Sequence, residues 1–61
     1  MIRYLFENKN EEWLTQNGDV TKDPNKAMKA KCEVEASLFL FARHGEGKYT
    51  DFYVTEHDFV D

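Results

Sequence analysis

The candidate soft metal ligands in this 61-residue sequence are Cys32, His44 and His57, and Cys32 is also a formal candidate nucleophile. The sequence has no Cys-x-x-Cys pair, no two histidines at helical spacing and no Asp-rich loop, which are the patterns typical of metal sites. Cys32 with either histidine is formally a nucleophile and its base, but a lone cysteine near a helix start is typical of a packing or capping residue. We therefore expect no metal, no cofactor and no catalytic residue.

Two other patterns resemble functional motifs but fit simpler structures. Gly45 and Gly47 lack the third glycine of a dinucleotide-binding loop, and they indicate a helix end followed by a turn. Two pairs of carboxylates stand two residues apart, which is typical of a solvated charged face rather than of acid–base catalysis: Glu33 with Glu35, and Glu56 with Asp58. A chain of this length can hardly enclose a substrate-sized cavity, so we expect that it is not an enzyme.

Four lysines form the only basic patch that the sequence predicts. Lys22, Lys26 and Lys29 recur at i, i+4 and i+7, with Lys31 close behind, so they can line one side of a short helix. Such a stripe could contact nucleic-acid phosphates or an acidic partner; an ordinary solvated helix face has the same pattern.

Aromatic residues exceed what one small core can bury. One Trp, three Tyr and five Phe compare with about six or seven large side chains that would cover one face of a small sheet. Some of these rings must therefore lie outside the core, as partner anchors or as cross-strand pairs that stabilise the sheet. Phe59 could join the anchors. The predicted partner-binding surface combines aromatic and acidic side chains: Trp13, Glu46, Tyr49, Asp51, Tyr53, Glu56 and Asp58.

Charge is distributed unevenly along the chain. The formal net charge is −4, and residues 32–61 hold seven acidic side chains against two basic ones. Because phosphate binding depends on clustered Lys and Arg, this half favours a basic protein surface over nucleic acid as the partner. A single cysteine allows no internal disulfide, and no apolar stretch approaches the length of a membrane span, so we expect a soluble, cytoplasmic protein without a membrane partner.

The elements that must position these residues follow from periodicity and turn chemistry. Alternation predicts strands over residues 2–6 and 11–15, and Asn17-Gly18 predicts a tight turn. A second hairpin through Val20 and Thr21 is conceivable, although the following Asp23-Pro24 leaves room for only a stub of strand there. The densest β-branched and aromatic stretch, residues 48–56, predicts a third strand.

Two helices are predicted between the second and third strands. Asp23-Pro24 is a helix-start signal, so we expect a short helix over residues 24–30. A longer helix over residues 33–44 presents Val34, Leu38 and Phe41 as one apolar stripe, with Leu40 and Ala42 on its flank. The apolar run 36–42 is also compatible with a buried strand.

These elements predict one α+β domain over residues 1–61. An antiparallel three-stranded sheet in the order 2-1-3 carries the main helix on one face, with a short helix preceding it. The opposite face of the sheet is left open.

Three segments resemble a group of very small phage and prophage proteins. Residues 13–27 carry the tryptophan strand, the Gly-bearing turn and Thr-x-Asp-Pro; residues 33–36 and 52–56 match the alanine-led helix and a final strand that ends in Glu. One departure is Ala30, where many relatives have Phe, and Met28 is expected to supply the packing. The resemblance implies a protein that binds and blocks or modulates a host protein, including CRISPR or restriction machinery, in the bacterial cytoplasm.

The leading hypothesis is therefore a noncatalytic, phage-type and anti-CRISPR-like binding protein. It would dock its acidic and aromatic surface on a host protein or nucleoprotein complex and inhibit or modulate it. Two alternatives remain open: a nucleic-acid-binding module that uses the four lysines, and a structural homodimer that pairs its sheet edges.

Overall fold

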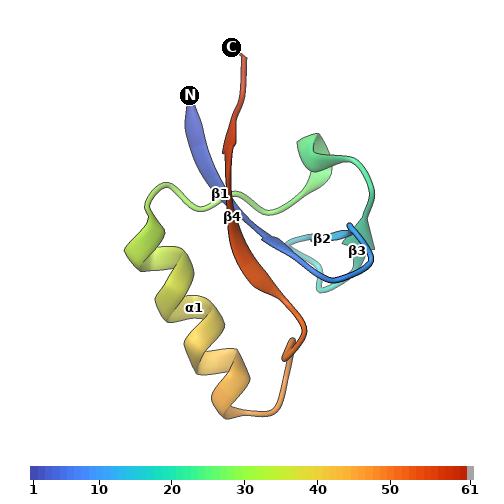
Figure 1. Ribbon diagram of the computed structural model, residues 1–61, viewed down its shortest axis with the longest axis vertical. Coiled ribbons are helices and arrows are strands. Elements are labelled where there is room, and N and C mark those ends of the chain that lie inside the picture. Colours follow the sequence, from blue (N-terminus) through green and yellow to red (C-terminus); the bar gives the residue numbers. More distant parts are fainter. Residues whose placement is uncertain (61) are drawn as a thin grey trace.

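The computed structural model describes residues 1–60 (Figure 1). Within these residues, four strands form one antiparallel sheet in the order β3-β2-β1-β4, and a single α-helix, α1, packs on one face of it. The elements are β1 (Ile2–Glu7), β2 (Trp13–Leu14), β3 (Val20–Thr21), a 3-10 turn (Pro24–Lys26), α1 (Glu33–Gly45) and β4 (Tyr53–Asp58). The predicted α+β class with one main helix on an antiparallel sheet is confirmed.

The centre of the sheet is the long pairing of β1 with β4. Six consecutive residue pairs join them, from Ile2 opposite Asp58 to Glu7 opposite Tyr53, so the two chain ends lie side by side (Figure 1). β2 flanks the other edge of β1, which is the predicted order 2-1-3. The predicted count of three strands is wrong, because the stub at Val20 and Thr21 pairs with β2 as a fourth strand.

The predicted short helix over residues 24–30 is only partly formed, because it begins at Pro24 as predicted but ends at Lys26. Asp23 caps a single 3-10 turn through a hydrogen bond from the Asn25 amide, and Ala27 already has extended backbone angles. The chain then runs beside β1, where the Ala30 amide and carbonyl both bond to Tyr4. A helix would forfeit these sheet hydrogen bonds. Met28 packs against the core beside Ala30, as the sequence predicts.

The third predicted strand begins five residues late. Residues 48–52 form the connection after α1, with Tyr49 at a φ of 53°, and the strand runs from Tyr53 to Asp58. Helix α1 matches its prediction closely: Cys32 caps it through its Sγ, which accepts a hydrogen bond from the Glu35 amide at 3.4 Å. Acidic residues occupy its first turn and Arg43 and His44 its last, which suits the helix dipole.

The core is small and lies between α1 and the even-numbered residues of β1 and β4. Its helix residues are Ala36 and Leu40, with Phe39 packed alongside. The stripe that the periodicity predicts, Val34, Leu38 and Phe41, instead faces solvent. That prediction is wrong because α1 has two apolar rows on opposite sides, and the narrow sheet can cover only one of them. The full core comprises Phe6, Leu14, Ala30, Ala36, Leu40 and Phe52.

Candidate partner-binding surface

A row of three side chains crosses the sheet on the face that α1 does not cover. In the strand register, Glu7 of β1 lies opposite Trp13 of β2 on one side and opposite Tyr53 of β4 on the other. Directly opposed residues of an antiparallel sheet project to the same face, so the Glu7 carboxylate lies between two aromatic side chains. Phe6 and Val54, the next residues along, point to the core.

Trp13 also covers the middle of this face. Its ring meets that of His57 edge-on, with centroids 5.7 Å apart, although β2 and β4 lie on opposite sides of β1. Between them in the register is Leu5, which is fully buried even though it lies outside the main core. The Trp13 and His57 rings therefore close over Leu5 and create a second apolar cluster. The buried Trp13 indole nitrogen has no acceptor among residues 1–60, which fits a packing role for this ring.

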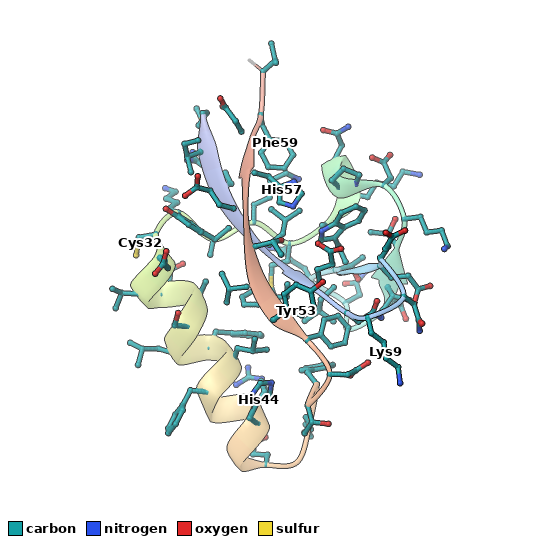
Figure 2. The ribbon with its side chains drawn as sticks, viewed as in Figure 1. Lys9, Cys32, His44, Tyr53, His57 and Phe59 are labelled. Carbon is teal, nitrogen blue, oxygen red and sulfur yellow. The ribbon has the colours of Figure 1, made fainter. Side chains whose placement is uncertain are left out.

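Aromatic side chains continue along β4 from this cluster. Figure 2 shows Tyr53, His57 and Phe59 spaced along the side of the strand that faces away from α1. The rings of His57 and Phe59 lie 6.2 Å apart, and the Lys29 ammonium lies 5.0 Å from the Phe59 ring centre. Tyr53 is the most accessible of these three aromatic side chains, because 49% of it is exposed.

Among residues 1–60, Glu7 is the only carboxylate that the strand pairing sets between two aromatic residues. It is half-buried, and it forms no ion pair with any residue in the part of the chain that the structure describes. Sequence reasoning missed it because the first strand was ended at Phe6. Extending the alternation of Arg3 and Leu5 by one step would have found Glu7.

Two of the seven predicted partner-binding residues, Trp13 and Tyr53, lie on this helix-free face. Tyr49 does not: it packs edge-on against the core residue Phe52 at 5.5 Å, and its carbonyl accepts a hydrogen bond from His44. Glu46 is the C-cap of α1 and lies 3.6 Å from the Lys48 ammonium.

The remaining predicted acidic residues also lie elsewhere. Asp51 is exposed in the turn before β4. Glu56 and Asp58 point to the helix side of β4, where Asp58 pairs with the N-terminal amine at 2.8 Å. Glu56 accepts a weak hydrogen bond from the Tyr4 hydroxyl at 3.4 Å. Partial burial raises the pKa of Tyr4, and the negative charges of Glu56 and Glu33 raise it further.

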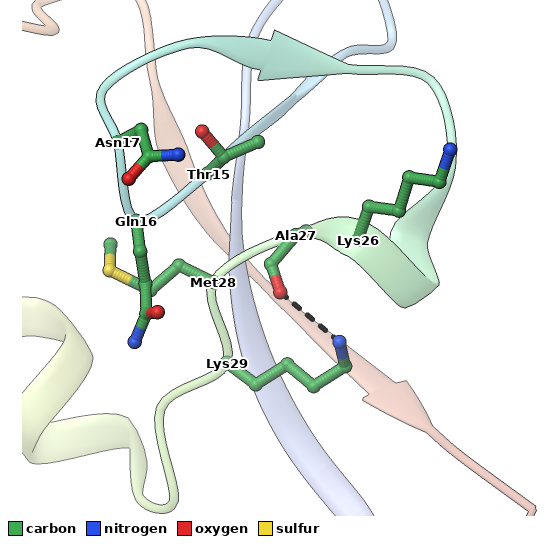
Figure 3. Close-up of a pocket in the computed structure, with 7 residues that line it drawn as sticks. All are labelled: Thr15, Gln16, Asn17, Lys26, Ala27, Met28 and Lys29. Atoms are coloured by element: carbon green, nitrogen blue, oxygen red, sulfur yellow. Dashed lines mark hydrogen bonds between the residues drawn. The ribbon is translucent and has the colours of Figure 1, made fainter.

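The predicted lysine stripe is not formed, because the helix that would align it is a single 3-10 turn. The Lys29 ammonium folds back onto the backbone and donates to the carbonyls of Asn25 and Ala27 at 2.8 and 3.1 Å. Lys22 and Lys31 are exposed, and each lies in a different part of the connection. Lys26 and Lys29 line a polar hollow of about 410 Å³. Figure 3 shows the residues that line it. Its other lining residues are Thr15, Gln16, Asn17, Ala27 and Met28.

The candidate nucleophile and bases are kept apart or engaged in structural contacts. Cys32 and His44 lie at opposite ends of α1 (Figure 2), so they cannot act on one substrate atom. His57 Nε2 lies 3.1 Å from the Thr55 hydroxyl, within β4. In residues 1–60 no three His, Cys, Asp or Glu side chains converge to hold a metal ion. No helix of this part of the chain is long and apolar enough to cross a membrane.

No protein-family model matches this chain, and neither a curated protein nor a solved structure matches it.

Proposed function

We propose that this chain is a noncatalytic binding protein that docks the helix-free face of its sheet onto a basic segment of a partner protein. The contact surface is the row of Trp13, Glu7 and Tyr53 across three strands. Under this proposal the protein acts in the cytoplasm of a bacterial cell, where it inhibits or modulates a host protein or nucleoprotein complex, as phage-type modulators of defence systems do.

The position of Glu7 in this row carries the proposal. A carboxylate that is half-buried and lacks an ion pair within residues 1–60 can accept charge-assisted hydrogen bonds from an incoming Lys or Arg. The half-exposed Tyr53 beside it offers a ring face to the same cation and to its aliphatic stem. Tyr and Trp are also the side chains that most often anchor protein interfaces.

The same row supports a protein partner over a nucleic acid. Glu7 would repel a phosphate backbone, and the lysines that could attract one do not share a helical face. The hollow between Lys26 and Lys29 is the one observation that favours nucleic acid, and the experiment below includes it.

Capture from a bacterial lysate by immobilised protein tests the proposal. Four forms are compared: wild type, Glu7→Gln, Tyr53→Ala and, as a charge-matched control, Glu46→Gln. We expect a partner, identified by mass spectrometry, that wild type and Glu46→Gln retain and that Glu7→Gln and Tyr53→Ala lose. High salt should also elute the partner from the immobilised wild type, because the contact is ionic.

Two results would contradict the proposal. Equal capture of the same proteins by all four forms would remove the row from the interface. Salt-sensitive binding of purified DNA or RNA that survives Glu7→Gln but not Lys26→Glu would assign the nucleic-acid function instead.

A further inference from the structure

Helix α1 carries a second apolar row on the side that faces away from the sheet. Val34, Leu38 and Phe41 are 68%, 64% and 79% exposed. Because each residue turns an α-helix by about 100°, this row is diametrically opposite the buried Ala36 and Leu40. Figure 1 shows α1 at one edge of the molecule, with no other segment beyond it.

The row is large for so small a protein. Its three side chains expose on the order of 400 Å², which is comparable to the largest apolar patch on a typical monomer. Doubled across two copies and extended by the flanking side chains, it approaches the lower limit of a specific interface, about 1,200 Å² in total.

We propose that a second copy of this chain covers the row, with the two α1 helices packed antiparallel about a two-fold axis beside Leu38. The apolar rows of two copies are complementary in shape when the helices run antiparallel. Reversing one helix sets Leu38 against Leu38, and it sets the small Val34 against the large Phe41 at both ends. A two-fold axis requires such self-complementarity, and alternating small and large side chains fill the space between helices.

The charges of α1 favour the same antiparallel direction. Glu33 in the first turn and His44 in the last project from one flank of the helix, and in an antiparallel pair each flank meets its own copy. Glu33 of one copy then lies beside His44 of the other. His44 Nε2 donates to the Tyr49 carbonyl at 2.8 Å, so only the imidazolium form, which carries a second N–H on Nδ1, can also donate to the Glu33 carboxylate. The antiparallel helix dipoles add to the attraction.

This dimer leaves Trp13 and Glu7 accessible, because they lie on the opposite face of the sheet, whereas Tyr53 also lines a hollow beside Phe41. It also differs from pairing of sheet edges, which would use β3 or β4 rather than α1. A dimer of this kind presents two docking faces and would bind a repeated partner more tightly than one copy can.

Disulfide trapping tests both the contact and its direction. Cys32→Ser serves as the background, because serine also caps helices. Single cysteines are then placed at Leu38, Val34, Phe41 and, as a control for random collision, at the exposed Thr50. In two helices packed 8 to 10 Å apart, facing Cα atoms lie about 5 Å apart, which suits a disulfide.

We expect Leu38→Cys to cross-link to itself, and Val34→Cys to cross-link to Phe41→Cys only when the two are mixed. Thr50→Cys should stay reduced. Self-linking of Val34→Cys and of Phe41→Cys in place of the mixed product would contradict the antiparallel arrangement. Cross-linking of Thr50→Cys as fast as Leu38→Cys would show random collision and contradict the interface.

Sedimentation of the untagged protein from micromolar to millimolar concentration provides the second measurement. Wild type should associate to a dimer, Leu38→Glu should weaken the association at least tenfold, and Glu7→Gln should leave it unchanged. Because Leu38 is exposed in one copy, Leu38→Glu should retain its helical circular dichroism. A wild-type protein that is monomeric throughout this range would overturn the proposal, and so would a dimer that Leu38→Glu does not weaken.

Discussion

The two faces of the sheet are covered in different ways. On one face, the α1 residues Ala36 and Leu40 close over Phe6 and Phe52 to make the main core. On the other face no helix is present, yet Leu5 is as completely buried as Phe6, because Trp13 and His57 meet above it. The difference shows how a short chain gains burial without a second helix: one large side chain from a neighbouring strand covers the centre, and the ends of that face stay available for a partner.

The largest effect should come from removing the central side chain of either face. Phe6→Ala should lower the free energy of unfolding by about 4 kcal/mol and Leu5→Ala by about 3 kcal/mol, since each leaves a cavity. Both losses are large for a domain of this length, so urea titration at low temperature is the suitable measurement. A loss below about 1 kcal/mol for Leu5→Ala would show that the helix-free face has no core of its own.

Two leucines of helix α1 test how the helix-covered face is buried. Leu40 is 5% exposed and Leu38 is 64% exposed. Leu40→Ala should lower the free energy of unfolding by about 3 kcal/mol, whereas Leu38→Ala should change that of the dilute monomer by less than about 0.5 kcal/mol. Equal losses would contradict the burial of only one of the two apolar rows of the helix.

Trp13 and Tyr53 divide the helix-free face into a covered part and an open part. Trp13→Ala uncovers Leu5 and should lower the free energy of unfolding by about 2 to 3 kcal/mol. Tyr53→Ala should lower it by less than about 1 kcal/mol, because half of Tyr53 is already exposed. Thermal melts of the two variants distinguish these outcomes. Equal stability of both variants would contradict the role of Trp13 as the cover of the second cluster.

The smallest effect concerns Tyr4, at the edge of the helix-covered face. Its pKa is raised above 10.0 by partial burial and by the nearby carboxylates, so the folded protein resists ionisation of this hydroxyl more than the unfolded chain does. The contribution of Tyr4 to the stability of the folded protein is therefore complete below the pKa of Tyr4 in the unfolded chain. It disappears as the pH rises through the pKa of Tyr4 in the folded protein.

Urea titrations above pH 10 check this prediction. The midpoint of unfolding should fall with rising pH in wild type and fall less in Tyr4→Phe, while the two proteins behave alike at neutral pH. An identical decline in both proteins would contradict the assignment to Tyr4.

Much of the local structure could be predicted because it depends on neighbouring residues. The Cys32 start of α1, the turn at Gly18 and the order of the three main strands follow from capping, positive φ and alternation. The predicted bounds of an element were wrong where the chain makes long-range hydrogen bonds. The backbone of Ala30 bonds to that of Tyr4, and no local sequence signal distinguishes this extended arrangement from a short helix.

The candidate site divides in the same way. The sequence by itself determined that aromatic residues exceed the core and that Trp13 and Tyr53 alternate away from Leu14 and Val54. Only the tertiary structure decided that both flank Glu7, because that alignment depends on the register of three strands. It also decided which apolar row of α1 is buried. Periodicity fixes the angle between two apolar rows of a helix, but it does not decide which row faces the sheet. In α1 that choice depends on the contact between Phe39 and Phe6 of β1, whose ring centroids lie 5.0 Å apart.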